Sequence, residues 1–398
     1  MKRLLFYVMV ILGLFLSKTP ANCLMNNDLS ESASISLMTC GAGESLYSMF
    51  GHSALWVYDP INRIDRIYNY GTFDFSDPNF YYLFLRGIAN YKLSVTNSQS
   101  FLNEYIQENR TVQEQRLHLT HSEKQILFNA LEENYKPENR YYRYDFLFLN
   151  CSSVLRDKVF ESVEGSYSMD QTSYDQSFRD LLQPYLTNSW IKLGINLVLG
   201  HRAEREATNW ERMFLPDLMH KQFELALVSN NESLAPDSQT IYLSTSTPTA
   251  TPGNSSKVPV IVFFVLFMLI GVITKKKLNQ RRWNKVLDSV IFSLSGLIGL
   301  LLSFMWFFSE HEVVHQNLNL LWAFPLHIIL AIMIWIPFFR SGIRQYSKVF
   351  FFINIVFLLL ALISIQEIPT AVFLFAGITL IRLFRFAFFP DIINQVNR

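Results

Sequence analysis

The chain has few charged residues and few cysteines, and each low count limits the functions that the chain can have. Charged residues make up 17% of its 398 residues, and 34 Lys and Arg against 33 Asp and Glu leave a formal net charge of +1. Nucleic-acid binding needs a basic surface for the phosphates, so this balance argues against nucleic acid as a partner. The three cysteines, Cys23, Cys40 and Cys151, are an odd number, which leaves at least one thiol free.

What the chain has in abundance is apolar residues, which make up 50% of the total and include 35 Phe. Most of the charge lies before about residue 230, whereas the apolar weight lies after residue 257. This division predicts two regions in different solvents, a water-exposed domain followed by a membrane domain.

The first residues are typical of a secretory signal. A basic start at residues 1–3 precedes the apolar run Leu4–Leu16, and the small residues Thr19 and Ala21 follow it. We therefore expect a signal peptide over residues 1–22 and export of the chain from residue 24 onward. An uncleaved anchor is the alternative.

Residues 24–228 have the pattern of one exported α+β domain, large enough to bury a core. Their β-branched and aromatic content predicts strands at 34–37, 54–58 and 66–70. We also expect a short helical piece over 45–50 and a helix over 121–134, which Thr120 and Glu123 begin with a capping box. Residues 229–257 are polar, rich in Ser, Thr and Pro and without periodicity, which predicts a flexible linker.

The remaining residues, 258–398, contain five apolar segments and predict an all-α bundle of five transmembrane helices. The expected spans are about 258–274, 286–308, 320–339, 349–365 and 370–388. Lys and Arg are frequent in the loops 275–285 and 340–348 and absent from 309–319 and 366–369. By the positive-inside rule, we expect a multi-pass protein of the inner membrane. Its water-exposed domain should lie outside and its C-terminus in the cytoplasm. Arg382 and Arg385 are expected to snorkel to the inner face.

One stretch before the membrane domain predicts a reactive thiol. An apolar run ends at Asn150, a good helix N-cap, and Cys151 opens the following helix. Free N–H groups and the positive end of the helix dipole favour a thiolate there, so Cys151 is the candidate nucleophile. The alternatives are a buried, inert cysteine and a Cys40–Cys151 disulfide.

A cysteine nucleophile needs a base, and His52 is the best placed of the eight histidines. It follows a glycine at the start of a predicted strand, where a side chain is held rigidly beside open space. His327 lies inside the third expected span, where an ionisable group is either functional or satisfied between helices. The third catalytic group stays open among four residues near His52: Asp59, Asp65, Tyr68 and Asn69.

Three blocks of the sequence, at residues 37–54, 69–75 and 144–153, resemble a family of membrane proteins of Bacteroidota, the Lnb-type lipoprotein N-acyltransferases. The resemblance implies a periplasmic domain on a membrane bundle. It also implies a domain similar in plan to the permuted papain-like NlpC/P60 group, in which the His precedes the Cys. By this resemblance Cys151 is the nucleophile and His52 the base.

The resemblance implies an acyltransferase that takes a fatty acyl chain from a phospholipid and passes it, through a Cys151 thioester, to the N-terminal amine of a diacylglyceryl-cysteine lipoprotein. Asn150 and Ser152 are expected to support the oxyanion through backbone amides at the helix N-terminus. No cofactor or metal is required. The alternatives are a membrane-anchored NlpC/P60-like cysteine hydrolase of cell-wall peptides and a non-enzymatic receptor or scaffold.

A competing motif lies in the loop between the second and third expected spans. His311, Glu312 and His315 match the His-Glu-x-x-His pattern of zinc peptidases, although no obvious third ligand follows. We instead expect His311, His315, Asn317 and Asn319 to form a polar patch at the outer membrane face, which contacts a lipid headgroup or the acceptor amine. A loop tip that only avoids the bilayer is the plain alternative.

Overall fold

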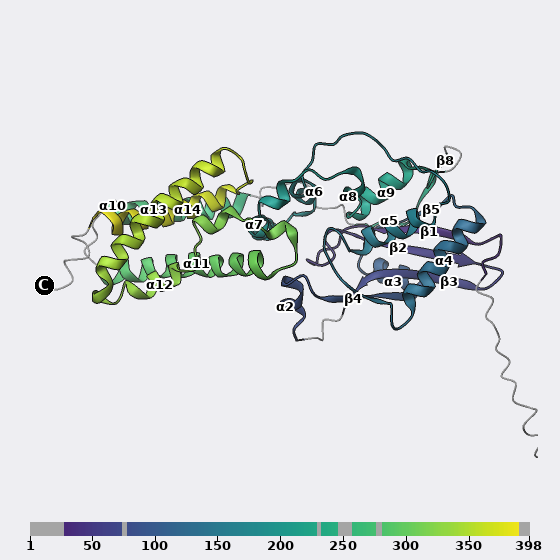
Figure 1. Cartoon of the computed structure of the whole chain (residues 1–398), viewed down its shortest axis with the longest axis horizontal. Helices are drawn as coiled ribbons and strands as arrows, with labels where there is room; N and C mark the ends of the chain where they lie inside the picture. Colours follow the sequence, from purple (N-terminus) through teal and green to yellow (C-terminus); the bar gives the residue numbers. More distant parts are fainter. Residues whose placement is uncertain (1–27, 74–77, 229–231, 246–256, 276–280, 390–398) are drawn as a thin grey trace, which may run out of the picture.

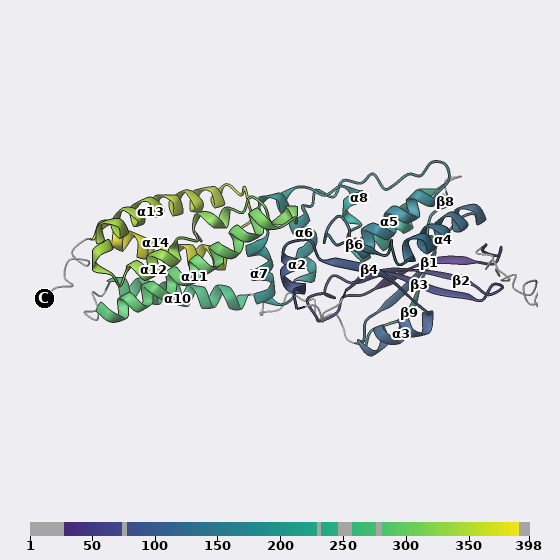
Figure 2. The same cartoon turned by 60° about the horizontal axis from the view of Figure 1, so that its bottom comes forward.

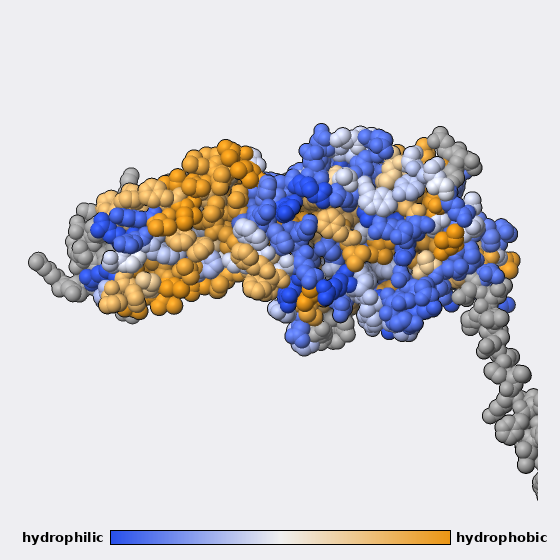
Figure 3. Space-filling view, viewed as in Figure 1, coloured by the Kyte–Doolittle hydropathy of each residue, from blue (hydrophilic) through white to orange (hydrophobic). Residues whose placement is uncertain are grey.

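The computed structural model describes residues 28–73, 78–228, 232–245, 257–275 and 281–389. The predicted signal peptide and Cys23 lie outside these residues. The chain forms two lobes arranged end to end, one built around a β-sheet and one built of long helices that run along the molecule (Figure 1). The surface of the helical lobe is largely hydrophobic and that of the sheet lobe largely hydrophilic (Figure 3).

The first lobe is organised by a seven-stranded antiparallel sheet with the strand order β6-β4-β3-β2-β1-β5-β9. Its strands are β1 (Ser34–Cys40), β2 (His52–Asp59), β3 (Ile64–Thr72), β4 (Asn90–Thr96), β5 (Val112–Arg116), β6 (Tyr141–Arg143) and β9 (Ser238–Tyr242). The three strands expected from composition are confirmed, since each lies within one of β1, β2 and β3.

Successive side chains along a strand point to opposite faces of the sheet. Helices cover both of these faces. Leu37 and Leu55 pack with helices α4 (His121–Tyr135) and α5 (Cys151–Ser162), whereas Met38 and Ala54 pack with α3 (Ser98–Gln107). Figure 2 shows α4 and α5 on one side of the sheet and α3 on the other. The capping box expected at Thr120 is present at the start of α4.

Short elements complete this lobe. They are α2 (Phe80–Leu85), α6 (Phe178–Leu182), η1 (Gln183–Tyr185), α7 (Ser189–Val198), η2 (His201–Glu204), α8 (Asn209–Arg212), α9 (Pro216–Leu225), β7 (Leu227–Val228) and β8 (Glu232–Ser233).

Two local predictions for this lobe are wrong. Residues 45–50 form turns and bends rather than a helical piece. The linker expected over 229–257 contains β9, which pairs with the outer edge of β5, so the folded domain extends past residue 228. Without β9, the outer edge of β5 would expose unpaired backbone N–H and C=O groups. The hydrogen bonds that β9 makes with this edge stabilise it as a strand despite its polar composition.

The second lobe contains α10 (Val258–Lys275), α11 (Arg281–Phe308), α12 (His327–Met333), α13 (Arg340–Leu362) and α14 (Thr370–Phe388), with η5 (Glu312–Val314), η6 (Leu318–Leu321) and η7 (Pro337–Phe339). Among the described residues, three helical stretches are long and apolar enough to cross a membrane: 283–308, 337–362 and 370–388. A shorter apolar helix covers 258–274.

The third expected span, 320–339, is not one helix. It is divided into η6, α12 and η7, with Pro325 before α12 and Pro337 at the start of η7. Proline has no backbone N–H and its ring clashes with the preceding turn, so it interrupts a continuous helix. Hydropathy alone does not register such interruptions.

The expectation that Arg382 and Arg385 snorkel is also wrong. Arg382 is fully buried and hydrogen-bonds the buried carboxylate of Asp288 in α11, and Arg385 lies 3.6 Å from the same carboxylate. These charges join α11 to α14 inside the helical lobe, where pairing offsets part of the cost of burial.

The loop 309–319 joins the two lobes. Ser309 donates to the carbonyl of Leu85 at 2.7 Å, and Asn317 donates to the carbonyls of Leu197 and Val198 at 2.9 and 3.0 Å. The backbone N–H of Gly200 donates to the carbonyl of Val313 at 2.8 Å. The sheet lobe is therefore held against the membrane lobe by buried hydrogen bonds, which fix its orientation.

Gly200→Ala should loosen this junction. A Cβ at Gly200 would lie 2.0 Å from the carbonyl oxygen of His315, so the loop 309–319 must move. We expect a loss of about 1–3 kcal/mol, typical of overpacking, and faster hydrogen exchange in 309–319. Thermal unfolding and hydrogen exchange of the full chain in detergent measure both.

The matched control is Gly194→Ala in α7, where a Cβ meets nothing within 4 Å. Alanine is the better helix former, so this variant should be as stable as the parent or slightly more so. Equal behaviour of the two variants would contradict the role given to the loop.

Candidate active site

The N-terminus of α5 is held by an asparagine whose side-chain amide is fully used. Asn150 is buried, and its carbonyl oxygen accepts from the backbone N–H groups of Ser152 and Ser153, both at 2.9 Å. Its amide nitrogen donates to the carbonyls of Phe146 and Phe214 at 2.8 and 2.9 Å. The predicted N-cap is thus present, and Cys151 is the first residue of the helix.

His52 is the first residue of β2, and its side chain hydrogen-bonds that of Asn69 in β3. The His52 Nε2 and Asn69 Oδ1 atoms are 2.6 Å apart. An amide oxygen only accepts, so Nε2 carries the proton and Nδ1 is left for the thiol of Cys151. Of the four residues left open by the sequence, Asn69 is therefore the one that hydrogen-bonds the His52 ring.

The other three have different tasks. Asp59, at the far end of β2, caps the turn that follows and binds Ser30. Asp65 accepts from Trp56 and from Ser98 at the start of α3. Tyr68 hydrogen-bonds Glu132 of α4.

Cys151 and His52 stabilise each other's charged forms. Burial opposes ionisation of the thiol, but the charge of His52, its hydrogen bond to the sulfur and the backbone N–H of Ser53 together lower the pKa of Cys151 below its ordinary value. Burial likewise disfavours the imidazolium, yet the charge and hydrogen bond of Cys151 and the bond to Asn69 raise the pKa of His52. Both shifts favour the charged forms, so the contact stabilises the thiolate–imidazolium pair, the reactive state of a cysteine nucleophile.

Gly71 in β3 lies against both members of the pair. A Cβ at this position would lie 3.6 Å from the Cβ of Cys151 and 3.9 Å from the Cε1 of His52. Its φ of +91° also lies where L-residues are strained. These distances are ordinary contacts, so it is the backbone conformation rather than the space that favours glycine here.

Ser152 does not have the role expected from its position. Its backbone N–H already donates to the side chain of Asn150, so that amide is not available to an oxyanion. Its buried hydroxyl lies 3.0 Å from that of Ser53, which ties α5 to β2 beside the sulfur. The backbone N–H of Cys151 itself is the remaining donor at the helix terminus.

The two described cysteines, Cys40 and Cys151, are both free thiols, so the disulfide alternative is not realised. Cys40 lies opposite His52 in the β1–β2 register and is buried beneath α3. Burial raises the pKa of the Cys40 thiol far above its ordinary value. Cys40 is thus an inert neighbour, whereas Cys151 is partly accessible and activated.

The four residues expected at the outer membrane face lie in the junction between the lobes. His311 donates through Nε2 to the carbonyl of Phe84 at 2.9 Å, and His315 to that of Ser309 at 2.9 Å. Asn317 and Asn319 are buried and donate to carbonyls of α7. Within the described residues, no cluster of three or more His, Cys, Asp or Glu is arranged to hold a metal ion.

One of these four residues, His311, contacts the turn that precedes Cys151. His311 Nδ1 lies 3.5 Å from a carboxylate oxygen of Asp145, which itself accepts from the backbone N–H groups of Leu147 and Phe148. Burial disfavours the Asp145 carboxylate, but the bonds from His311 and these amides lower its pKa. The loop of the membrane lobe therefore supports the turn that leads into Cys151, a contact that the sequence alone did not indicate.

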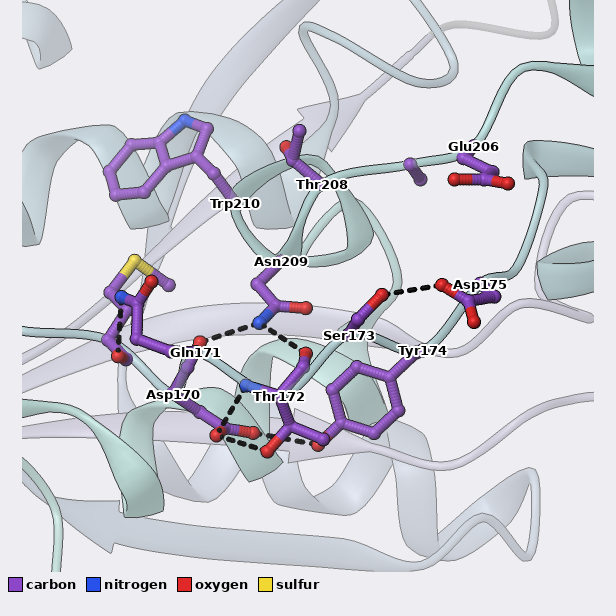
Figure 4. Close-up of a pocket in the computed structure, with 12 residues that line it drawn as sticks. Asp170, Gln171, Thr172, Ser173, Tyr174, Asp175, Glu206, Thr208, Asn209 and Trp210 are labelled. Carbon is purple, nitrogen blue, oxygen red and sulfur yellow. Dashed lines mark hydrogen bonds between the residues drawn. The ribbon is translucent and has the colours of Figure 1, made fainter.

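A cavity of about 500 Å³ lies elsewhere in the sheet lobe, lined by residues 169–175 and 206–210. In Figure 4, Asp170 accepts from Thr172, while Asn209 donates to the backbone carbonyls of Asp170 and Thr172. Trp210 packs against Phe160, nine residues along α5 from Cys151 and thus about 13 Å away at the helical rise. None of the predicted site residues lines this cavity.

Two domain models of one protein family match this chain. A model described as the Lnb N-terminal periplasmic domain matches residues 21–184, and one described as the Lnb transmembrane domain matches residues 253–390. The chain belongs to the Lnb family. Within this Lnb protein, His52, Asn69 and Cys151 all fall in the periplasmic domain, and the loop 309–319 falls in the transmembrane domain. No curated protein and no solved structure matches the chain.

Alkylation of the Lnb protein by iodoacetamide should report the ion pair. Because the pKa of Cys151 is lowered, its alkylation rate should begin to fall at a lower pH than that of an ordinary thiol. His52→Ala removes the partner charge, so the midpoint should move to higher pH, and the rate below that midpoint should fall about tenfold for each pKa unit of the move. Mass spectrometry of the Cys151 peptide measures the rate.

Cys40→Ala is the control, and its Cys151 profile should match that of the parent because Cys40 is buried and protonated. An unchanged profile in His52→Ala would show that the two side chains are not paired.

Proposed function

We propose that this chain is a thiol-dependent acyltransferase that moves a fatty acyl chain from a phospholipid to the N-terminal amine of a diacylglyceryl-cysteine lipoprotein. The observation that carries the proposal is the Cys151–His52–Asn69 arrangement at the end of the sheet that faces the membrane lobe. Membership of the Lnb family supports it. A thiol on that side of the sheet lobe supports a reaction with a substrate held at the membrane surface.

In the first half-reaction the Cys151 thiolate attacks the ester carbonyl of the donor. A bond forms between sulfur and carbonyl carbon, the ester C–O bond breaks, and the leaving oxygen takes the proton of the His52 imidazolium. The products are a thioester on Cys151 and a lysophospholipid. Asn69 keeps the imidazole in the tautomer that this transfer requires.

In the second half-reaction the amine of the acceptor attacks the thioester. His52, now neutral, takes a proton from the amine, the C–S bond breaks, and an amide and the thiolate result. The oxyanion of each tetrahedral intermediate is held by the backbone N–H of Cys151, at the positive end of α5. No metal or cofactor enters either step.

The proposed fold relationship is to the permuted papain-like domains. The supports are the order of His52 before Cys151 in the chain, the cysteine at a helix N-terminus packed on an antiparallel sheet, and an Asn that orients the His. A Cys–His–Asn arrangement is defined by geometry and roles rather than by chain order.

The proposed orientation places the sheet lobe in the periplasm and the C-terminus in the cytoplasm of a bacterial inner membrane. The loop 309–319, which lacks Lys and Arg, contacts the sheet lobe at the end of α11, whereas the basic residues Lys285, Arg340, Arg344 and Lys348 lie in the first turns of α11 and α13, at their other ends. Positive residues favour the cytoplasmic side, which agrees with this orientation.

A cysteine hydrolase of cell-wall peptides would use the same pair of residues. It would differ in its substrate and in the second half-reaction, where water rather than an amine attacks. The location of Cys151 beside a membrane lobe favours a lipid donor, so we place the acyltransferase first.

Intact-mass spectrometry after incubation with phospholipid vesicles tests the first half-reaction. The parent protein should gain the mass of one fatty acyl group, and hydroxylamine should remove it because a thioester is cleaved readily. Cys151→Ala should gain nothing, and His52→Ala should gain the group at least about a hundredfold more slowly, the usual loss on removing a general acid–base. Cys40→Ala should behave like the parent.

A parent protein that binds lipid yet never acquires the group would overturn acyl transfer through Cys151. A group that persists in Cys151→Ala would place the nucleophile elsewhere.

A further inference from the structure

Helix α2 is apolar throughout and has no buried side chain. Its sequence is Phe-Tyr-Tyr-Leu-Phe-Leu, with Tyr81 72% and Tyr82 51% exposed. A water-soluble domain does not normally expose such a helix, whereas aromatic residues are common where a protein meets the membrane surface. Figures 1 and 2 both place α2 at the junction with the membrane lobe.

The outer end of α11 lies directly against α2. The rings of Tyr82 and Phe304 are 6.1 Å apart, and Ser309 and His311 donate to the carbonyls of Leu85 and Phe84. Beyond Phe304, Phe308 is 60% exposed, as expected of a ring that lies in lipid. The apolar surface of the membrane lobe is therefore continuous with α2.

From α2 a series of four rings leads toward the nucleophile. Phe80 stacks on Phe73 at 5.0 Å, Phe73 lies 5.1 Å from Tyr91, and Tyr91 stacks on Tyr144 at 4.1 Å. Tyr144 directly precedes Asp145, which pairs with Leu149 through two backbone hydrogen bonds of 3.1 and 3.2 Å, so the ring lies at the start of the turn that leads into Cys151. Burial raises the pKa of Tyr144, and the charge of the Cys151 sulfur adds to this rise. We call Phe80, Phe73, Tyr91 and Tyr144 the ring series.

We propose that α2 and the ring series bind the acyl chain of a phospholipid donor on its way from the outer leaflet to Cys151. This inference rests on the proposed function and adds the route and the residues that recognise the chain. Each methylene drawn out of the bilayer into water would weaken binding about fourfold, so a chain can reach the sulfur only along an apolar surface. Among the described residues, the ring series is an apolar row of side chains between α11 and Cys151, and because Tyr91 is 5% exposed, the chain must displace that ring as it passes.

The test places a photo-crosslinking amino acid, p-benzoylphenylalanine, at one position of the full chain in vesicles of phosphatidylethanolamine and phosphatidylglycerol. The positions are Tyr82 at the outer end, Phe73 within the ring series, and Tyr58 as control. Tyr58 is 41% exposed and lies at the opposite end of β2 from His52. Lipid adducts at Tyr82 and Phe73 but not at Tyr58 are expected. Adducts at Tyr82 alone would show that α2 only rests on the membrane and would overturn the route.

A kinetic comparison separates the route from a general structural effect. Phe73→Ala should slow thioester formation from a long-chain phospholipid about tenfold, while alkylation of Cys151 by iodoacetamide stays within about twofold of the parent. Phe73→Leu keeps an apolar side chain and should recover most of the loss. Equal losses in both reactions, or no loss in either, would contradict the inference.

The two proposals fail separately. Absence of any thioester in the parent overturns the acyltransferase, whatever the crosslinks show. A normal thioester without an adduct at Phe73 overturns the route alone.

Discussion

The pairing of Cys151 with His52 is the interaction on which the rest of the structure depends. Each charge is partly buried and would be costly alone, so the two must be held in contact by other elements. Asn150 fixes the helix end through four hydrogen bonds, and Ser152 ties it to β2. The pair is therefore the product of a helix N-terminus and two adjacent strands rather than of any local motif.

The same constraint explains the junction between the lobes. The proposed function requires the Cys151 thiol to face the bilayer, and hydrogen bonds from the loop 309–319 hold the sheet lobe against the membrane lobe. His311 links Asp145, six residues before Cys151, to the carbonyl of Phe84 in α2. One side chain of the membrane domain thus contacts both the catalytic turn and the helix at the membrane surface.

The sequence predicted best what depends on neighbours in the chain. The cap at Asn150, the position of Cys151 at a helix start and the capping box at Thr120 are short-range features, and the structure confirms them. The family resemblance is likewise confirmed by the matches to both Lnb domains. His52 could be singled out because a strand start beside a glycine is also a local feature.

What the sequence did not predict depends on strand register and contacts between distant segments. Choosing Asn69 over its three competitors requires knowing how β2 pairs with β3, and the bulge after Asn69 is not visible in composition. The N–H of Ser152 was expected to be free, but whether Asn150 uses it depends on a side-chain conformation. The strand β9 and the interrupted segment 320–339 were missed because edge pairing and proline breaks are not measured by polarity.

The most direct test of acyl transfer follows the acyl group after it has left the lipid. Enzyme carrying a labelled acyl group on Cys151, freed of phospholipid, is mixed with a diacylglyceryl-cysteine peptide, and the label is followed by mass spectrometry. If Cys151 transfers the acyl group, the label moves to the α-amine of the peptide, and an N-acetylated peptide receives none. Release of the label only as free fatty acid, with or without the peptide, would contradict acyl transfer and identify a hydrolase.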